Sequence, residues 1–269
     1  MKKLLVVLGM TALSLFICKA VFAETVGNSI DINIPAGKGV YSSQLSDFIT
    51  LNAGFDAEFL TERKFKYDST YTTKAPELAG NYYMARVSST LFNRVQPYVK
   101  FGYSDLEMSW QDANGNVKVD ADPAFAWGVG LKAYLWEFEG MGLKIFSTGS
   151  YRATEPSKVK INTDGVTGSV TSKKFQVYEK QATLGMSKEI KLAYNASLVP
   201  YAGVAWSDTT ARVRVTQNSN VMNSGAKEPK DNLGVFFGTE FLFMDNFSLN
   251  LEARLIDQTA ISTGFTALF

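Results

Sequence analysis

The chain of 269 residues contains no histidine and a single cysteine, Cys18. Without histidine it cannot build a Ser-His-Asp triad, and most zinc sites are excluded as well. Because Cys18 lies near the N-terminus in an apolar segment, the rest of the chain has no thiol with which to form a disulfide. We therefore expect no catalytic, cofactor or metal site, and we expect stability to come from strand pairing and packing.

The sequence also lacks an apolar run long enough for a membrane-spanning helix. Its longest one, residues 4–17, follows Lys2 and Lys3 and falls short of the roughly 20 residues that a helix needs to cross a bilayer. Val21, Phe22 and Ala23 then form a small-x-small cleavage site. The pattern predicts a signal peptide, residues 1–23, cleaved after Ala23. An uncleaved anchor and a lipid attached at Cys18 are the alternatives.

No excess of positive charge remains once this segment is removed. The loss of Lys2, Lys3 and Lys19 leaves 24 basic against 26 acidic residues, a net charge of about −2. Such a balance gives no basic field for nucleic acid, so we expect no nucleic-acid partner.

Alternation of apolar and polar residues dominates the rest of the chain. Residues 24–46 are polar and interrupted by Pro35 and Gly37, and we interpret them as a periplasmic lead-in or a short plug. Residues 47–269 contain period-two segments typical of half-buried strands. Ten strands are expected, over residues 47–59, 80–92, 97–104, 125–135, 144–152, 177–187, 198–207, 233–243, 247–255 and 259–269.

Short turns on one side and long connections on the other complete the pattern. Open sheet edges are not tolerated in lipid, so the prediction is an all-β transmembrane antiparallel up-and-down β-barrel of about ten strands, with eight or twelve as alternatives. Residues 112–116 are interpreted as a hairpin tip around Asn114-Gly115 rather than a calcium loop, since the later acidic ligand is missing. Lys180 falls on the lipid face and is expected to reach the headgroups.

The polar side of each strand faces the lumen and carries both signs of charge. The inward set has five acids and six bases, a balance that predicts pairing across the lumen. The alternative is a narrow pore with a charged constriction. The set comprises Asp56, Glu58, Arg86, Lys100, Lys132, Lys144, Arg152, Glu179, Glu240, Glu252 and Arg254.

Three long polar connections, residues 60–78, 154–175 and 208–230, are predicted to be external loops. The second contains Asp164-Gly165 and is expected to rise above the membrane as a hairpin. Loops on a rigid scaffold commonly carry recognition. The most contact-prone cluster is Lys64, Lys66, Tyr67 and Tyr71, and an ordinary solvated loop is the alternative.

The last residues carry a resemblance to a known family. Ser262, Gly264, Ala267 and Phe269, with Phe265 on the outward face, follow a spacing that resembles the C-terminal strand of bacterial outer-membrane β-barrels. This resemblance implies export across the inner membrane, delivery to the outer membrane of a Gram-negative-type bacterium, and recognition by the barrel-assembly machinery. The ten-stranded surface proteases of that family use a histidine, which this chain lacks.

These observations predict a structural or surface role without enzymatic chemistry. The partners expected are outer-membrane lipid and, by resemblance, the assembly machinery, while an external ligand is not identified. A narrow pore and an adhesin acting through the long loops are the alternatives.

Overall fold

A computed structural model describes residues 49–66, 72–92, 94–112, 115–138, 141–163, 166–167, 172–192, 196–217, 220–243 and 246–269. The predicted signal peptide with Ala23 and the predicted lead-in, residues 24–46, lie outside the described residues. Within the described ranges no helix has the length and apolar character needed to cross a membrane.

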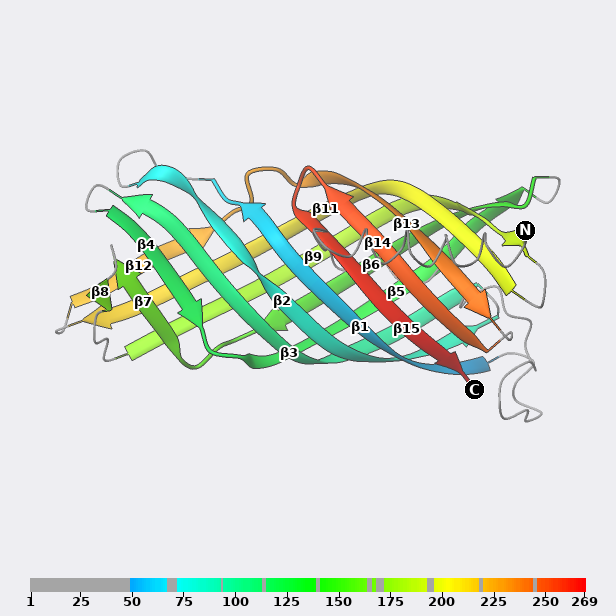
Figure 1. Cartoon of the computed structure of the whole chain (residues 1–269), viewed down its shortest axis with the longest axis horizontal. Coiled ribbons are helices and arrows are strands. Elements are labelled where there is room, and N and C mark those ends of the chain that lie inside the picture. The colour runs from blue at the N-terminus through cyan, green and yellow to red at the C-terminus, as the bar shows by residue number, and fades with distance from the viewer. Residues whose placement is uncertain are drawn as a thin grey trace, which may run out of the picture.

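Ten antiparallel strands close into a barrel, as the alternation predicts (Figure 1). Each strand pairs with its neighbour along the barrel, and β1 pairs with β15 from Asn52↔Leu268 to Glu62↔Thr259. This pairing leaves no open edge in the membrane. The barrel strands are β1 (Ile49–Lys64), β2 (Thr72–Leu91), β3 (Val95–Asp112), β5 (Ala124–Phe138), β6 (Leu143–Thr154), β9 (Ser172–Lys188), β11 (Ala196–Gln217), β13 (Leu233–Phe243), β14 (Phe247–Leu255) and β15 (Thr259–Leu268).

Five shorter strands lie at the two ends. At the end with the long connections, β4 (Gly115–Ala121) continues β3 as a hairpin, β7 (Val159–Thr163) pairs with β4, β8 (Val166–Thr167) with β7, and β12 (Asn220–Lys227) with β11. The predicted hairpin is confirmed, because Asp112 pairs with Gly115, whose φ of 132° suits glycine, while Asn114 of its tip lies outside the described residues. At the opposite end β10 (Ile190–Lys191) pairs with β11.

The half of the barrel nearer the short turns has an apolar outside and a polar inside. In β14, Leu249 and Leu251 are exposed on the outside while Asn250 and Glu252 are buried in the lumen. Four phenylalanine rings stack in a row and form an aromatic girdle, with neighbouring ring centroids 5.7 to 5.8 Å apart. In order along the row they are Phe241, Phe243, Phe247 and Phe265. Apolar outside, aromatic rim and polar inside are the features of a barrel that spans a lipid bilayer.

This polarity reverses further along the strands. In β3 the outward residues change from Tyr103 to Asp105, and the inward residues change from Ser104 to Leu106. The same outward change occurs in β11 between Trp206 and Asp208. We place the outer edge of the membrane at this reversal, because charged outward side chains belong in water. Lys180 of β9 is exposed and pairs in register with Asp208 at this edge, and its contact with the headgroups stays a prediction.

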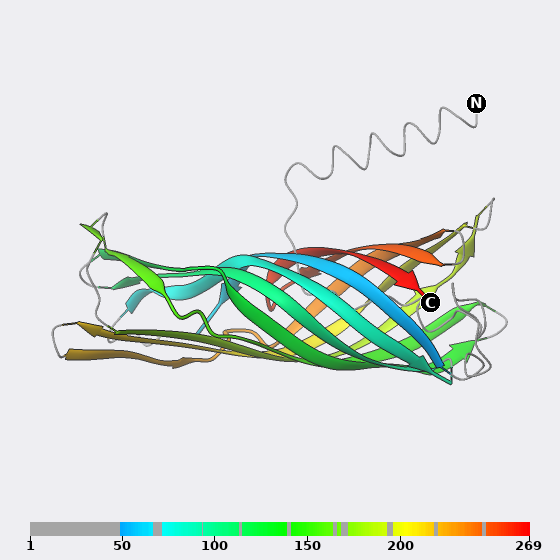
Figure 2. The same cartoon turned by 90° about the horizontal axis from the view of Figure 1, so that it is seen from below.

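Beyond the reversal lies an outer extension, built largely of strands where the sequence predicted loops. The hairpin expected within the second connection is confirmed by the antiparallel pairing of β7 with β8. Residues 60–64, 72–78 and 208–217 continue β1, β2 and β11, so the loop prediction for them is wrong. Figure 2 shows the extension as two layers, with β1 to β4 and β7 in one and β9, β11 and β12 in the other. Tyr67 and Tyr71 of the predicted contact cluster lie outside the described residues.

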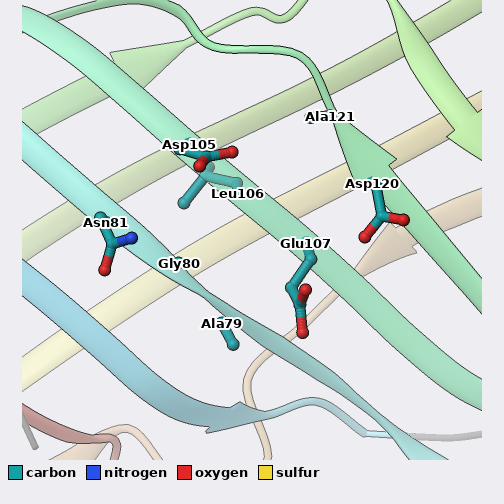
Figure 3. Close-up of a pocket in the computed structure, with 8 residues that line it drawn as sticks. All are labelled: Ala79, Gly80, Asn81, Asp105, Leu106, Glu107, Asp120 and Ala121. Atoms are coloured by element: carbon teal, nitrogen blue, oxygen red, sulfur yellow. The ribbon is translucent and has the colours of Figure 1, made fainter.

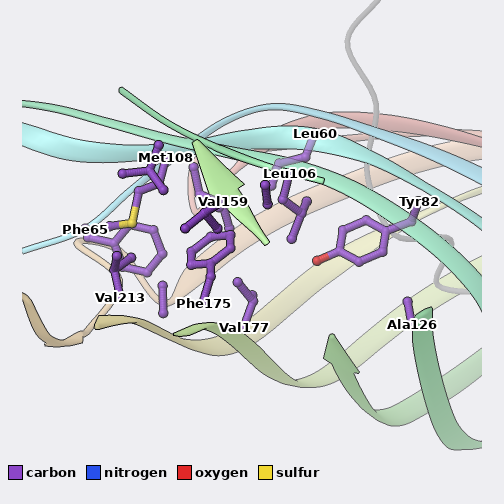
Figure 4. Packing of buried hydrophobic residues seen from close by; sticks show 14 of the residues in the cluster. Leu60, Phe65, Tyr82, Leu106, Met108, Ala126, Val159, Phe175, Val177 and Val213 are labelled. Atoms are coloured by element: carbon purple, nitrogen blue, oxygen red, sulfur yellow. The ribbon is translucent and has the colours of Figure 1, made fainter. Parts of the chain in front are cut away.

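An apolar core holds the two layers together. Buried side chains from several strands belong to one packed cluster (Figure 4). They include Phe65, which directly follows β1, Met108 of β3, Val159 of β7 and Phe175 of β9. Burial of apolar side chains stabilises these strands outside the membrane, where solvated loops would otherwise be expected. We call this cluster the apolar cap; it consists of Leu60, Phe65, Leu78, Tyr82, Met84, Leu106, Met108, Val117, Val119, Ala121, Ala126, Val159, Phe175, Val177, Ala211, Val213 and Ala260.

Candidate functional site

The lumen below the apolar cap contains a set of buried charges, six acids and six bases among the described residues. Ten of the eleven charges assigned to the lumen from the sequence are in it. Lys144 is the exception: its side chain lies near the short turns and pairs with the exposed Glu137 at 3.3 Å. The luminal charges are Asp56, Glu58, Arg63, Arg86, Lys100, Lys132, Arg152, Glu179, Glu240, Glu252, Arg254 and Asp257.

Arg152 lies at the centre of the set. Both of its terminal nitrogens donate to Glu58, and one also donates to Glu179 at 2.5 Å. Its guanidinium stacks over the Tyr82 ring at 3.6 Å from the centroid. A planar guanidinium can satisfy two carboxylates and an aromatic face together, which a lysine could not do. Arg152 therefore ties β6 to β1, β2 and β9 across the lumen.

Arg63 joins this cluster although the sequence pattern assigns it to a loop. A register irregularity between Leu60 and Arg63 shifts the alternation of β1, which turns Arg63 inward. Its guanidinium donates to Glu179 at 2.6 Å and to Gln258 at 2.8 Å, and it also contacts Ser207. Sequence reasoning could not find this residue, because unbroken alternation would point Arg63 outward.

Asp257 is the second charge that the sequence analysis missed, since it follows β14 in a predicted turn. Ile256 before it has a φ of 87°, and Asp257 points inward to accept from Arg254 and, at 2.7 Å, from Ser207. Gly234 leaves room for this carboxylate: a Cβ there would lie 1.9 Å from Asp257 Oδ1. The turn thus places a buried acid beside Arg254.

Asp56 of β1 is bound by bases from the two strands that follow. Lys100 Nζ lies 3.0 Å from Asp56 Oδ2 and Arg86 Nε lies 3.9 Å from it. Arg86 also donates to Thr266 of β15 at 2.5 Å. These contacts link β1, β2, β3 and β15 around the closing seam of the barrel.

Aromatic side chains fill the lumen nearer the short turns. Phe146, Tyr201 and Phe236 form a buried cluster with centroids 6.2 Å apart, and Lys132 Nζ lies 5.7 Å from the centre of the Phe146 ring. Tyr201 donates to Glu252 at 2.9 Å. From one end to the other, the described interior is therefore aromatic, ionic and then apolar.

These observations determine the class of structure. A closed antiparallel barrel with an apolar, aromatic-rimmed outside and a charged, filled inside spans an outer membrane. The fold is that of a bacterial outer-membrane β-barrel.

Comparisons with known proteins add the following. No protein family model matches the chain, and no curated protein matches it. Similar solved structures include the outer-membrane protease OmpT from Escherichia coli, at 8% identity and a TM-score of 0.41, covering 82% of this chain and 93% of that one. The β domain of the Bordetella autotransporter BrkA has 11% identity and a TM-score of 0.41, covering 83% and 100%. The outer-membrane protein OprG from Pseudomonas aeruginosa has 10% sequence identity and a TM-score of 0.39, and the match covers 82% of this chain and 96% of that one.

Similarity at this level gives no information on activity. The assignment as an outer-membrane barrel rests on strand closure and on the polarity of the two faces of this chain. Among the described residues no group of three or more acidic or cysteine side chains is arranged to hold a metal ion.

The predicted assembly-signal residues all lie in or directly after the closing strand β15. Ser262 and Gly264 face the lumen, whereas Phe265 and Phe269 are exposed on the outside and Ala267 is half-buried. A Cβ on Gly264 would lie 2.6 Å from Asp56 Oδ1, so this glycine leaves room for a luminal charge. Gly264 thus has a packing role within the folded barrel.

A pocket of about 280 Å³ lies outside the lumen, on the outer extension (Figure 3). It is lined by Gly80, Asn81, Asp105, Glu107 and Asp120, together with Ala79, Leu106 and Ala121. Lys118 lies 2.8 Å from Glu107 and 3.2 Å from Asp120, and these hydrogen bonds raise the pKa of Lys118 above its usual value. Two of the three carboxylates thus share one lysine of the same chain.

Close contact between Gly238 and the Tyr201 ring in the lumen should contribute to stability. Gly238 lies under Tyr201, and a Cβ added there would be 2.5 Å from the ring and its hydroxyl. We expect Gly238→Ala to lower the free energy of unfolding by about 1–3 kcal/mol, because the ring must move within a packed lumen. Urea unfolding in phospholipid vesicles measures this. Gly149→Ala is the matched control, since a Cβ at Gly149 meets nothing within 4 Å; equal losses in both variants would contradict the packing argument.

Proposed function

We propose that the chain is a closed outer-membrane barrel with a structural or surface role, whose lumen is held shut by its own side chains. The supporting observation is the balanced set of twelve buried charges, nine of which form ion pairs with one another, between an aromatic cluster and the apolar cap. Barrels of this size have room for side chains and little else, whereas wide aqueous channels need about 16 strands.

The luminal charges and the apolar cap oppose ion flow through the barrel in different ways. Paired charges hold one another in place, so an ion that enters must displace a partner from a buried, low-dielectric site. The apolar cap opposes the entrance of water from the outside, as hydrophobic constrictions do in channels. Together they favour a closed barrel over a narrow pore.

We further propose the route by which the chain reaches its membrane. The signal peptide is cleaved after Ala23, residues 24–46 lead into the barrel, and the assembly machinery recognises the strand that contains Ser262, Gly264, Phe265, Ala267 and Phe269. The outward aromatic residues Phe265 and Phe269 are accessible to a partner before insertion, which fits such recognition. We propose no catalytic role, since the sequence has no histidine and the acids of the central cluster are bound by arginines.

Planar-bilayer recording of the refolded protein tests the closed barrel. We expect no stable conductance steps, because the luminal charges and the cap leave no continuous aqueous path. Protease protection and an electrophoretic mobility shift on heating, measured on the same preparation, control for insertion and folding. Reproducible conductance steps from folded protein would favour the narrow pore instead.

Surface recognition is a second candidate, supported by the outer extension. Strands that continue past the membrane in two packed layers present a rigid, charged outer face, with Lys64, Lys118 and Arg212 exposed. Rigid scaffolds with polar outer faces commonly carry binding sites. Specific retention of the folded protein on host or matrix molecules, abolished by reversing the charge of these residues, would support an adhesin; retention unaffected by that change would argue against it.

A further inference from the structure

The outer extension is incomplete above β13, β14 and β15. These strands have 11, 9 and 10 residues, whereas β2 has 20 and β11 has 22. In Figure 1 the β14–β15 hairpin ends well short of β2 and β3. Beyond its pairing with β13, β11 continues from Ser207 to Gln217, whereas β1 continues beyond its pairing with β15 only to Lys64. We call the interval between β1 and β11 beyond these strand ends the notch.

Residues 228–232 cross this notch, and we call them the strap. On one side the Lys66 amide donates to the Glu228 carbonyl at 2.8 Å, and the Lys230 amide donates to the Lys64 carbonyl at 2.9 Å. On the other side the Ser207 amide donates to the Asn232 carbonyl at 2.8 Å. Pro229 is buried and pairs with Phe65 in an isolated bridge. The strap is thus a single peptide segment that joins β1 to β11.

Polar side chains lie beneath the strap, in contrast to the apolar cap. Ser207 and Arg254 have no exposed surface, and Arg63, Asp257 and Gln258 are at most 3% exposed. They are bound to one another and, through Arg63 and Glu179, to Arg152 at the centre of the lumen. We call Arg63, Ser207, Arg254, Asp257 and Gln258 the strap floor. It forms a continuous polar path from the notch into the luminal charges.

The strap floor has hydrogen-bond donors in excess. Arg63 Nε, Arg254 Nη1 and Gln258 Nε2 are buried and have no acceptor among the described residues. Buried polar groups are normally satisfied, by protein or by water. With Glu179 and Asp257 opposing Arg63 and Arg254, the floor is charge-balanced. Donors in a balanced site suit water and small hydrophilic solutes better than a bound anion.

We propose that the strap is a side gate, through which water and small hydrophilic solutes reach the luminal charges from outside the cell. The axial route is blocked by the apolar cap, while the strap floor offers polar groups directly behind one peptide segment. The side-chain part of the fastening to β1 is weak, because the Lys66–Glu228 pair at 3.0 Å has side chains 60% and 71% exposed, which leaves the backbone contacts and Pro229 to hold the strap. The gate goes beyond the closed barrel proposed above, since a barrel without steady conductance still opens locally.

Cysteine labelling tests the gate, in a Cys18→Ser background that removes the native thiol. Ser207→Cys and Gln258→Cys report on the strap floor, and Met108→Cys reports on the apolar cap. Cells or vesicles carrying the folded protein receive an anionic, membrane-impermeant methanethiosulfonate from outside. We expect both floor thiols to be modified at least about tenfold faster than the cap thiol, because labelling follows the population of the locally open state.

Fastening the strap by a disulfide should abolish this difference. Lys66→Cys with Glu228→Cys, oxidised before labelling, is expected to slow modification of either floor thiol by about tenfold or more. Glu107→Cys with Asp120→Cys, an in-register and partly exposed pair of β3 and β4 away from the strap, is the matched control and should leave the rate unchanged. The gate is overturned if floor and cap thiols react at equal rates, or if fastening the strap leaves both floor thiols as reactive as before.

Discussion

Replacement of Arg152 by methionine is expected to lower the free energy of unfolding by about 3–5 kcal/mol, the range for removing one partner of a buried ion pair. Glu58 and Glu179, both at most 4% exposed, would lose the cation that joins them. Arg63 would still bind Glu179, but Glu58 would have lost its two guanidinium contacts. Urea unfolding in phospholipid vesicles, followed by tryptophan fluorescence and by electrophoretic mobility, measures the loss.

Two controls separate the loss of charge pairing from the loss of side-chain volume. Glu58→Gln added to Arg152→Met neutralises the carboxylate that has lost both guanidinium contacts, while Glu179 keeps Arg63, and should recover a large part of the stability. Lys66→Met breaks an exposed pair and should cost less than about 1 kcal/mol. An Arg152→Met barrel as stable as the parent would refute the pairing of charges across the lumen.

Truncation of Phe175 to alanine is expected to cost about 3–5 kcal/mol, the usual range for Phe→Ala in a packed core. Phe175 has no exposed surface and lies in the apolar cap, between the two layers of the outer extension. Because the cap lies outside the membrane, the outer strands should loosen while the membrane half remains paired. External protease should then cut the extension more readily, and urea unfolding in vesicles should show the lost stability.

Phe175→Leu is the matched variant, since it keeps an apolar side chain of similar volume and should cost much less. Phe237→Ala supplies the contrast on the other side of the wall, where the ring is exposed toward lipid, and it should leave protease cleavage of the extension unchanged. If Phe175→Ala neither loosens the extension nor lowers stability by more than about 1 kcal/mol, the two layers are not held together by the cap.

The alternation of side chains along the chain was sufficient to predict the barrel. In β14 every second residue is apolar, from Phe247 to Leu255, and this local period places each side chain on a known face once the sheet is closed. Ten luminal charges followed from the same rule, because a strand that keeps its register also keeps its faces. The pattern is local, and so the sequence contains it in full.

The outer extension was missed although its period is also two. In β3 the alternation continues past Tyr103 with Leu106, Met108 and Trp110 inward, but the outward partners Asp105 and Glu107 are charged. Such residues suggest a solvated loop when the outside is assumed to be lipid. Only the packing of two layers outside the membrane reveals that the apolar face has moved to the inside.

The sequence by itself determined the fold class, the faces of the membrane strands and most of the luminal charges, since these depend on neighbours one and two residues apart. Tertiary structure decided the rest. A single irregularity after Leu60 turned Arg63 toward Glu179, which lies 116 positions away, and a residue of positive φ turned Asp257 toward Arg254. The strap and its floor depend on such pairings between distant segments, and a period of two cannot specify which strands end early or what crosses the space that they leave.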